Sequence, residues 1–589
     1  MNLIHRRRTI RSSQGAQPVQ PAAPAARVAQ PVVPAPSEQQ PGALALPEQR
    51  PVPPAQSVAP VQSAAPASAP PPAPTVQTTP PAAPSRQLAP SGQPAPHAAP
   101  DGEISRRDFL KLAATGLAGI TTFGLLSALY RHVEAATLPP AAAEPASSID
   151  DSSPSITRDM SKCIGCGNCV SACENVQRIG VYQLYQKDGR QYSNTKGEIP
   201  LAQTRCINCG QCVKVCPVGA LAEKDSIAEA LAAIDDPAKT VVWQIAPSVH
   251  NMLGEEFGLR SGADVTRKIA TAMKMLGGYA FHTDFAADVT IMEEGTEFIR
   301  RLRGGGAFPM ITSCCPGWIK YVEMHYPDLL PHVSSCKSPQ QMLGALVKSY
   351  FAQKSGIPAS GIFHISVMPC TAKKFECARP EMEDSRGARD VDLVLTAREF
   401  AKILRSKNIA FGSLPNGEFD SLMGEASGAA RIFGASGGVM EASLRAVSLL
   451  LTNSDLPPGA VGTLRTKDGF KSASVTIAGN VFNFAAINGI GNIRDTMDQL
   501  RAGSCPYHFI EVMSCPGGCI GGGGAPLHTE DMDRRQQGLY RSDVLLKNTV
   551  CLENSEMRSM YAEFLGQPCG PLSEELLHTR YESRAGTFS

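Results

Sequence analysis

Two runs of closely spaced cysteines constrain the fold of this chain more than any other feature of its sequence. Each run reads Cys-x-x-Cys-x-x-Cys-x-x-x-Cys; the first covers residues 163–173 and the second residues 206–216. Bacterial proteins that carry two 4Fe–4S clusters have this spacing, and in them the fourth cysteine of each run ligates the other cluster. The spacing therefore predicts one cluster on Cys163, Cys166, Cys169 and Cys216 and another on Cys206, Cys209, Cys212 and Cys173.

Zinc sites and disulfides are the alternatives for cysteines at such short spacings, and two intact runs in a long chain argue against both. Gly165, Gly167 and Gly210 stand where tight turns must aim several thiolates at one point. A long insert, residues 174–205, separates the runs. Clusters of this kind carry single electrons, so they indicate electron transfer but do not identify the reaction that the protein catalyses.

Further thiols follow three predicted strands. Cys314 and Cys315 come after an apolar run over 307–311, Cys370 follows residues 363–368, and Cys515 and Cys519 follow residues 508–513. Strands that end at one edge of a sheet bring such groups together, which predicts a single thiolate-ligated centre. The adjacent Cys314 and Cys315 cannot easily bridge each other, but one can serve as a ligand and the other as a free acid.

The region from about residue 239 to 525 alternates strands with helices. A buried strand is predicted over 240–245, helices over 265–276, 292–303 and 319–325, and strand and loop over 279–291. Residues 475–484 predict a β-hairpin that turns at Gly479-Asn480. The expected fold is an α/β catalytic domain of two lobes with the thiolate centre between them, preceded by an α+β ferredoxin-like domain.

The N-terminal quarter is different in composition. Residues 1–104 are dominated by Pro, Ala, Gln and Ser, which predicts disorder. Ser105-Arg106-Arg107-Asp108-Phe109-Leu110-Lys111 then precedes a mildly apolar run that ends in small residues near Ala135, the pattern of a twin-arginine (Tat) export signal. A membrane-anchor helix is the alternative, and residues 136–155 are expected to be a linker. A net charge of +1 gives no reason to expect nucleic-acid binding.

The cysteine runs and the three thiol-bearing strand ends together resemble the iron–iron (FeFe) hydrogenases over roughly residues 156–585. The segments 561–566 and 576–581 are similar to the small subunit of periplasmic members, fused here at the C-terminus. The resemblance implies these parts: a ferredoxin-like domain at 156–236, a catalytic domain at 237–526 and a small-subunit-like helical segment at 527–589. The resemblance to FeFe hydrogenases includes no 2Fe–2S domain and no sensory domain.

The family's active centre, the H-cluster, is a 4Fe–4S cubane joined through one cysteine to a two-iron subsite. That subsite carries CO, cyanide and an azadithiolate bridge, whose amine splits H₂ heterolytically. The resemblance implies that Cys519 bridges the two halves, and that the cubane ligands are Cys315, Cys370, Cys515 and Cys519. Thiolates suit iron at low potential because sulfur is a soft ligand.

The resemblance also implies a proton relay. It begins at the free thiol of Cys314 and continues through Glu294, Ser334 and Glu297, with Arg301 near the exit. A solvated helix face is the alternative for the two glutamates, and a helix cap is the alternative for Ser334. Cys336, Cys377, Cys505, Cys551 and Cys569 have no role in this scheme.

The diatomic ligands of the subsite need donors and a dry enclosure. Lys373 is implied as the donor to one cyanide and Pro247-Ser248 to the other, and Glu376 is expected to pair with Lys373 or Lys374. The enclosure is implied to include Gln340, Met368, Phe433, Gly434 and Met513, for which core packing is the alternative.

The sequence thus predicts a hydrogenase that catalyses 2H⁺ + 2e⁻ ⇌ H₂. Its expected partners are a c-type cytochrome or a ferredoxin, the Tat translocase, and maturation proteins that supply the subsite. The expected location is the periplasm, with membrane-anchored or cytoplasmic forms as alternatives. The rival functions are a non-catalytic iron–sulfur protein and a sensor of H₂ or redox state.

Overall fold

The computed structural model describes residues 149–589, except 385–386, 457–459, 467, 528–530 and 588–589. The predicted disordered region, the Tat segment and most of the predicted linker lie outside the described residues. The described part begins with strand β1 (Ile149–Asp150), so the segment expected to be linker contains a strand. Among the described residues, no helix is long and apolar enough to cross a bilayer.

The ferredoxin-like region is a small α+β unit. Strands β1, β2 (Ile156–Asp159) and β5 (Leu221–Glu223) form an antiparallel sheet in the order β1-β2-β5. The short helices α3 (Asn168–Ser171) and α4 (Gln211–Lys214) each begin after a glycine in the left-handed region, Gly167 at φ 76° and Gly210 at φ 69°. The insert between the cysteine runs forms the hairpin β3 (Tyr182–Lys187) and β4 (Arg190–Thr195).

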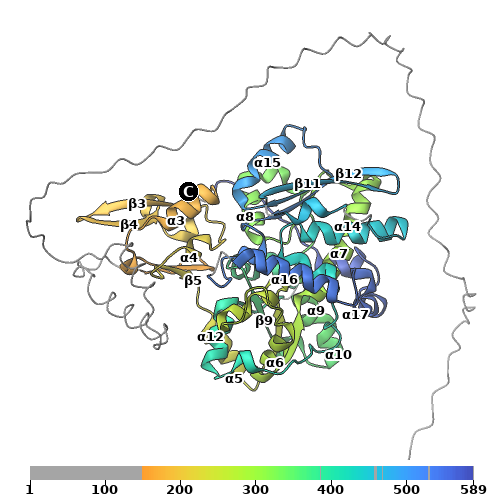
Figure 1. Ribbon diagram of the computed structural model, residues 1–589, viewed down its shortest axis with the longest axis horizontal. Helices are drawn as coiled ribbons and strands as arrows, with labels where there is room; N and C mark the ends of the chain where they lie inside the picture. The colour runs from red at the N-terminus through yellow and green to blue at the C-terminus, as the bar shows by residue number, and fades with distance from the viewer. Residues whose placement is uncertain (1–148, 385–386, 457–459, 467, 528–530, 588–589) are drawn as a thin grey trace, which may run out of the picture. The chain divides into compact units, whose positions relative to one another are not determined.

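The first sheet of the catalytic region is fully parallel, in the order β10-β9-β6-β7. Its strands are β6 (Thr240–Ile245), β7 (Tyr279–His282), β9 (Ile362–Met368) and β10 (Leu393–Thr396). β6 has the predicted bounds, and its Trp243 ring is fully buried beside Phe400 of the helix α12. The helices of this part are α6 (Thr266–Leu276), α9 (Pro339–Leu346), α10 (Ala352–Ser355), α11 (Ala372–Cys377) and α12 (Ala397–Ser406) (Figure 1). Helix α5 (Ile227–Asp235) lies within the segment expected to be ferredoxin-like, but its Ala230 belongs to the hydrophobic cluster of Trp243 and Phe400.

The second sheet has the order β11-β12-β13-β8. β12 (Asn480–Asn488), β13 (Phe509–Met513) and β8 (Met310–Ile311) run parallel, while β11 (Phe470–Ile477) is antiparallel to β12. The helices around it are α8 (Pro316–His325), α13 (Gly428–Arg431), α14 (Gly438–Thr452) and α15 (Arg494–Arg501).

Three sequence predictions need correction here. Helix α7 spans Thr283–Arg300 and so begins directly after β7, within the stretch predicted to be strand and loop. Most of its first half is buried on all sides, so it lacks the polar face that reveals a helix in sequence. The hairpin register pairs Ile477 with Asn480, so its turn is Ala478-Gly479, both at positive φ. Strand β8 consists of Met310–Ile311, which are only the last two residues of the apolar run over 307–311 that was expected to be a strand.

The C-terminal segment is helical, as predicted. It contains α16 (Met532–Leu545), α17 (Ser555–Met560) and α18 (Pro571–Leu577). Buried side chains of α17 and α18, including Met557, Met560 and Leu577, belong to the same hydrophobic cluster as Phe285 and Val289 of α7. The segment therefore contributes to the core beside α7.

Candidate active site

The ends of strands from both catalytic sheets meet around one cavity. Its lining includes Ala246 after β6, Thr283 after β7, Cys314 after β8 and Cys370 after β9, and residues 513–515 at the end of β13. Carboxyl ends of parallel strands lie at one edge of a sheet, which is where α/β proteins bind their ligands. The space between the surrounding atoms, counted out to the mouth, is about 750 Å³.

The cavity gathers all four cysteines expected to hold a cubane: Cys315, Cys370, Cys515 and Cys519. Burial, reinforced by the neighbouring thiols, raises the pKa of the Cys515 thiol to about 11 and that of Cys519 to about 12. Such a group of thiols releases its protons together only when a cation takes their place, which is what iron ligation does. The Ser514 N–H also lies 3.3 Å from the Cys315 sulfur, a contact of the kind that tunes cluster potential. The residues present therefore fit an iron–sulfur centre.

Two donors face the other side of the cavity. Lys373 Nζ lies 2.8 Å from Glu376 Oε2, 2.8 Å from Ser338 Oγ and 3.1 Å from the Cys314 carbonyl. Burial lowers the pKa of Lys373, but the Glu376 carboxylate outweighs this and holds that pKa above its ordinary value. The expected Lys373–Glu376 pair is thus confirmed. The Ser248 hydroxyl is fully buried in the same lining and has no hydrogen-bond partner, so it can donate a hydrogen bond to a ligand in the cavity.

The remaining predicted enclosure residues line the same cavity: Pro247, Gln340, Met368, Phe433, Gly434 and Met513. A Cβ on Gly434 would come within 2.8 Å of the Ser248 Cβ, so the backbone here needs glycine. The wall is mostly apolar, and a low-polarity wall strengthens the few polar contacts made inside it.

The predicted proton-relay residues form a connected series behind Cys314. Glu294 and Glu297 lie one turn apart on α7, and the Ser334 hydroxyl donates a 2.7 Å hydrogen bond to Glu297 Oε2. Burial, reinforced by the charge of Glu297, raises the pKa of Glu294 to about 8, while a hydrogen bond with Ser334 opposes the rise. Burial and the nearby Glu294 likewise raise the pKa of Cys314. Neither glutamate is on a solvated face, and Ser334 precedes no helix directly, so both sequence alternatives are wrong.

The eight ferredoxin-like cysteines fall into the two predicted groups. One pocket is lined by Cys163, Cys166, Cys169 and Cys216, and another by Cys173, Cys206, Cys209 and Cys212. Among the described residues no cysteine is in a disulfide.

The second pocket lies against the catalytic cavity. Thr371, next to Cys370, donates a 2.7 Å hydrogen bond to the Asn208 carbonyl, and Gln211 donates to the Gly521 carbonyl at 2.9 Å. A Cβ on Gly523 would lie 2.4 Å from the Cys209 carbonyl oxygen, so the two backbones touch.

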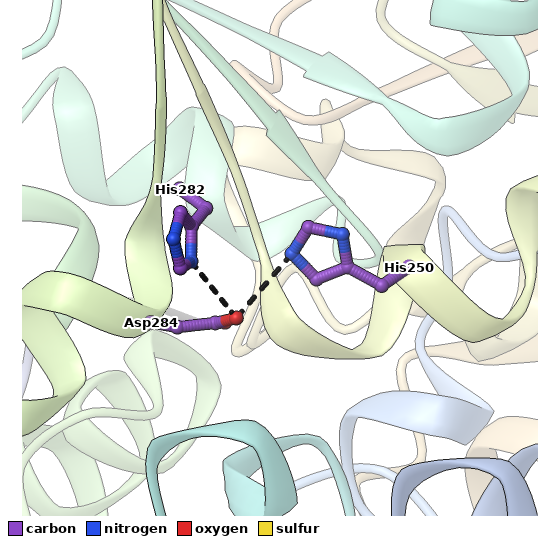
Figure 2. Close-up of side chains that lie close together, drawn as sticks. All are labelled: His250, His282 and Asp284. Carbon is purple, nitrogen blue, oxygen red and sulfur yellow. Dashed lines mark ion pairs between the residues drawn. The ribbon is translucent and has the colours of Figure 1, made fainter. Parts of the chain in front are cut away.

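A buried cluster behind the cavity wall escaped the sequence analysis. Asp284 Oδ2 lies 3.0 Å from His282 Nδ1 and 3.5 Å from His250 Nε2 (Figure 2). Arg431 Nη1 contacts the same oxygen at 2.8 Å, and Asp284 is fully buried. The two histidines and the carboxylate resemble a metal site, but Arg431 already neutralises Asp284, and a divalent cation would leave excess buried positive charge. The cluster is best described as an ion-pair network.

A second missed cluster joins α7 to the C-terminal segment. The fully buried Glu293 accepts hydrogen bonds from Tyr561 Oη and the Cys569 N–H, both at 2.5 Å, and from His578 Nε2 at 3.1 Å. Ser573 Oγ donates to the same carboxylate. These partners are more than 260 residues away in sequence, and no local pattern links them.

Family models match three parts of the chain. The model of the iron-only hydrogenase large subunit, C-terminal domain, matches residues 239–523. The model of the iron hydrogenase small subunit matches residues 529–584, and that of a 4Fe–4S dicluster domain matches residues 162–220.

Known proteins agree with these matches. The NADP-reducing hydrogenase subunit HndD of Solidesulfovibrio fructosivorans is 45% identical over 444 residues, covering 74% of this chain and 76% of that protein. The periplasmic Fe hydrogenase large subunit of Nitratidesulfovibrio vulgaris is 42% identical, covering 65% of this chain and 89% of that subunit. A solved FeFe-hydrogenase of Chlamydomonas reinhardtii superposes with a TM-score of 0.56 at 38% identity, covering 61% of this chain and 99% of that one. This chain therefore belongs to the iron-only (FeFe) hydrogenases and carries a dicluster domain and a small-subunit segment on the same polypeptide.

Proposed function

We propose how the residues of this hydrogenase divide the reaction 2H⁺ + 2e⁻ ⇌ H₂ among themselves. Family membership establishes that the chain is an oxidoreductase acting on H₂, with an H-cluster and two further 4Fe–4S clusters. The observation that carries the division of roles is the single cavity lined by Cys314, Lys373, Ser248 and the four clustered cysteines.

In this proposal Cys315, Cys370, Cys515 and Cys519 hold the cubane, and Cys519 also bridges to the two-iron subsite. When bound, the H-cluster supplies the iron that takes up H₂ and the amine base that receives the first proton. The two lobes are the parts built on the two sheets, with the H-cluster between them. Strand ends from both sheets in the cavity lining support this arrangement.

Lys373 and Ser248 act as the two donors that orient the cyanide ligands. A protonated Lys373 balanced by Glu376 provides a fixed positive end, and Ser248 contributes a hydroxyl that no protein group uses. Gln340, Met368, Phe433, Gly434 and Met513 exclude water, and Pro247 shapes the turn that presents Ser248.

Protons pass between Cys314 and Glu297 by way of Glu294 and Ser334. Because the pKa of Glu294 is raised to about 8, this carboxyl holds a proton at neutral pH and can release it at little cost. Its Oε1 has no protein partner, and Cys314 is close enough for the Glu294 charge to raise its pKa. The Ser334 hydroxyl donates to Glu297 Oε2 at 2.7 Å and also interacts with the Glu294 carboxyl, so it links the two acids.

Electrons pass through the cluster of Cys173, Cys206, Cys209 and Cys212 to that of Cys163, Cys166, Cys169 and Cys216. The first of these lies against the cavity, and the second reaches the surface, where Cys166 is exposed. The external partner is a c-type cytochrome or a ferredoxin. A cytochrome fits if residues 105–135 direct Tat export to the periplasm, and a ferredoxin fits a cytoplasmic enzyme.

The proposed domain boundaries are 156–236, 237–526 and 527–589, after a region of 1–104, a signal of 105–135 and a linker of 136–155. Export is tested by expressing the full chain with Arg106 and Arg107 intact or changed to Lys, and by assaying the periplasmic fraction. Loss of periplasmic enzyme in the double variant supports the Tat assignment, and equal amounts in both strains contradict it.

The division of roles is tested on matured enzyme by infrared spectroscopy and H₂ evolution. A Cys519→Ser variant should lose the CO and cyanide bands of the subsite, whereas Cys505→Ser, a half-buried cysteine outside the scheme, should retain them. Retained bands in Cys519→Ser would remove the bridging role from this residue.

A further inference from the structure

The outer end of the proposed relay is closed by an arginine. Arg301 donates to Glu297 Oε1 from Nη2 at 2.6 Å and from Nε at 3.1 Å, and its other contacts are the carbonyls of residues 307 and 331–333. The side chain of Arg301 is 9% exposed and that of Glu297 13%. A guanidinium does not release its proton in proteins, so Arg301 can hold Glu297 in place but cannot carry protons onward.

The other carboxylate oxygen of Glu297 faces a thiol. Cys336 Sγ lies 4.0 Å from Glu297 Oε2 and also 4.0 Å from His578 Nδ1, so it stands between the two groups. The residues are held there by an isolated β-bridge between Cys336 and His578. Burial and the nearby carboxylates raise the pKa of the Cys336 thiol, which opposes a free thiolate and favours taking one proton while giving up another.

The hydrogen bonds of His578 fix which nitrogen is free. Nε2 lies 3.1 Å from Glu293 Oε2, and because a carboxylate accepts, Nε2 must carry the proton of that bond. Nδ1 is then the unprotonated nitrogen. Its one lone pair accepts from the Ser335 hydroxyl at 2.8 Å and can take a proton when that hydroxyl turns away. Burial raises the pKa of Glu293, but hydrogen bonds from His578, Ser573 and Tyr561 outweigh it and keep this carboxyl ionised, so an anion lies 3.1 Å from the ring.

Solvent lies one step beyond the ring. Glu574 Oε2 is 3.8 Å from His578 Nδ1, and the Glu574 side chain is 47% exposed. An imidazole is the side chain best suited to take and release protons near neutral pH. The titratable groups that face the ring are thus Glu293, Cys336, Cys569, Glu574 and, through the Cys336 thiol, Glu297.

We propose that Cys336 and His578 carry protons between Glu297 and Glu574, so that the small-subunit segment contributes the outer part of the relay. In H₂ oxidation, Glu297 gives its proton to the Cys336 sulfur while the Cys336 S–H proton moves to His578 Nδ1. The imidazolium passes a proton to Glu574 and water, and each residue returns to its starting state. One proton leaves for each one that arrives at Glu297. The inference rests on the proposed roles of Glu294, Ser334 and Glu297.

The test uses full-length matured enzyme and three variants. His578→Gln keeps an amide donor for Glu293 and an acceptor for Ser335 but cannot hold a proton, and Cys336→Ala removes the intermediate S–H. Both should lower kcat for H₂ oxidation about tenfold or more with KM for H₂ unchanged, and raise the solvent isotope effect on kcat. Their CO and cyanide bands should match those of the unmodified enzyme. Glu294→Gln reports on the inner relay in the same assays.

Two matched controls are available. Cys551→Ala removes another buried thiol of the hydrophobic cluster that contains Cys336, and His332→Gln changes a histidine whose backbone carbonyl accepts from Arg301. Both should turn over like the unmodified enzyme.

Full turnover in His578→Gln and Cys336→Ala, while Glu294→Gln is inactive, would overturn the outer branch and leave the inner relay standing. A loss without a rise in the isotope effect would mean that His578 only anchors the segment, and would overturn the proposal too. Normal turnover in Glu294→Gln would instead remove the relay on which the inference rests.

Discussion

The Ser334 hydroxyl donates to Glu297 Oε2 at 2.7 Å, and this contact joins a loop between α8 and α9 to helix α7. It matters because the same hydroxyl also interacts with the buried Glu294, which lies one turn before Glu297 on α7. Two acids and one alcohol in contact form a path along which a proton can move without water.

Replacing Glu294 by Gln should stop turnover without disturbing the clusters. Glutamine keeps the size of the side chain and a contact with Ser334, but it has no proton to release. We expect kcat to fall about 100-fold or more, with the infrared bands of the H-cluster unchanged. Assays of H₂ evolution from reduced dye test this, with the exposed Glu418→Gln as control. Activity within a few-fold of the unmodified enzyme would exclude Glu294 from the relay.

Adding a methyl group at Gly523 should separate the ferredoxin-like region from the catalytic cavity. The new Cβ would lie 2.4 Å from the Cys209 carbonyl oxygen, so one backbone must move. We expect Gly523→Ala to cost about 1–3 kcal/mol in stability and to slow electron transfer from an external donor. Gly412→Ala, where nothing lies within 4 Å, is the control. Equal electron-transfer rates in the two variants would show that the contact is not needed.

Removing the charge of Asp284 should destabilise the protein strongly. Asp284→Asn removes the only carboxylate in direct contact with the guanidinium of Arg431 among the described residues, and the Arg431 side chain is only 4% exposed. Breaking a buried pair in this way costs about 3–5 kcal/mol. Thermal unfolding of the variant, compared with Asp328→Asn in an exposed pair with Arg501, measures the difference. A midpoint shift no larger than that of the exposed variant would contradict the ion-pair account of Figure 2.

His364 predicts a pH dependence of stability. Burial, with help from the charge of Lys348, lowers the pKa of this ring from its ordinary 6.5 to about 3 in the folded protein. Below about pH 6.5 the unfolded chain binds a proton at this ring and the folded chain does not. The free energy of unfolding therefore falls by about 1.4 kcal/mol for each unit that the pH is lowered between these two pKa values. His364→Asn lacks this dependence.

The stability gap between the two proteins should therefore narrow as the pH is lowered from 6.5 toward 4.5. Unfolding midpoints of both proteins across this range measure the gap, and they also cancel any acid lability of the clusters, which both share. Curves that stay parallel would show that His364 takes up a proton in the folded state.

Cysteine spacing predicted which thiols lie together, because ligation of one cluster requires short, fixed spacings between neighbouring cysteines in the sequence. Cys163 to Cys173 and Cys206 to Cys216 lie in short turns whose glycines adopt the required positive φ, for example Gly165 at 70°. The sequence also predicted a single cavity at the strand ends, since Cys314, Cys370 and Cys515 each follow a strand within three residues. By contrast, α7 was placed nine residues too late, because its buried first half shows no amphipathic period.

The missed clusters share a different cause. His250, His282 and Asp284 meet Arg431, and Glu293 meets His578, only after segments far apart in sequence have packed together. Nothing local distinguishes His578 from any other histidine, and its position beside Cys336 becomes visible only with the fold. Hydrophobic periodicity and motif spacing describe neighbours in the sequence, so they do not predict contacts between residues this far apart in the chain.

The most direct test of the account is made on Cys314. Matured unmodified enzyme and Cys314→Ser should show the same CO and cyanide stretching bands, because this thiol is not an iron ligand in the proposal. The unmodified enzyme should evolve H₂ and the variant should be nearly inactive, because a serine hydroxyl is too weak an acid to pass protons on. H₂ evolution at the unmodified rate in Cys314→Ser, with bands present, would contradict the relay at its first step.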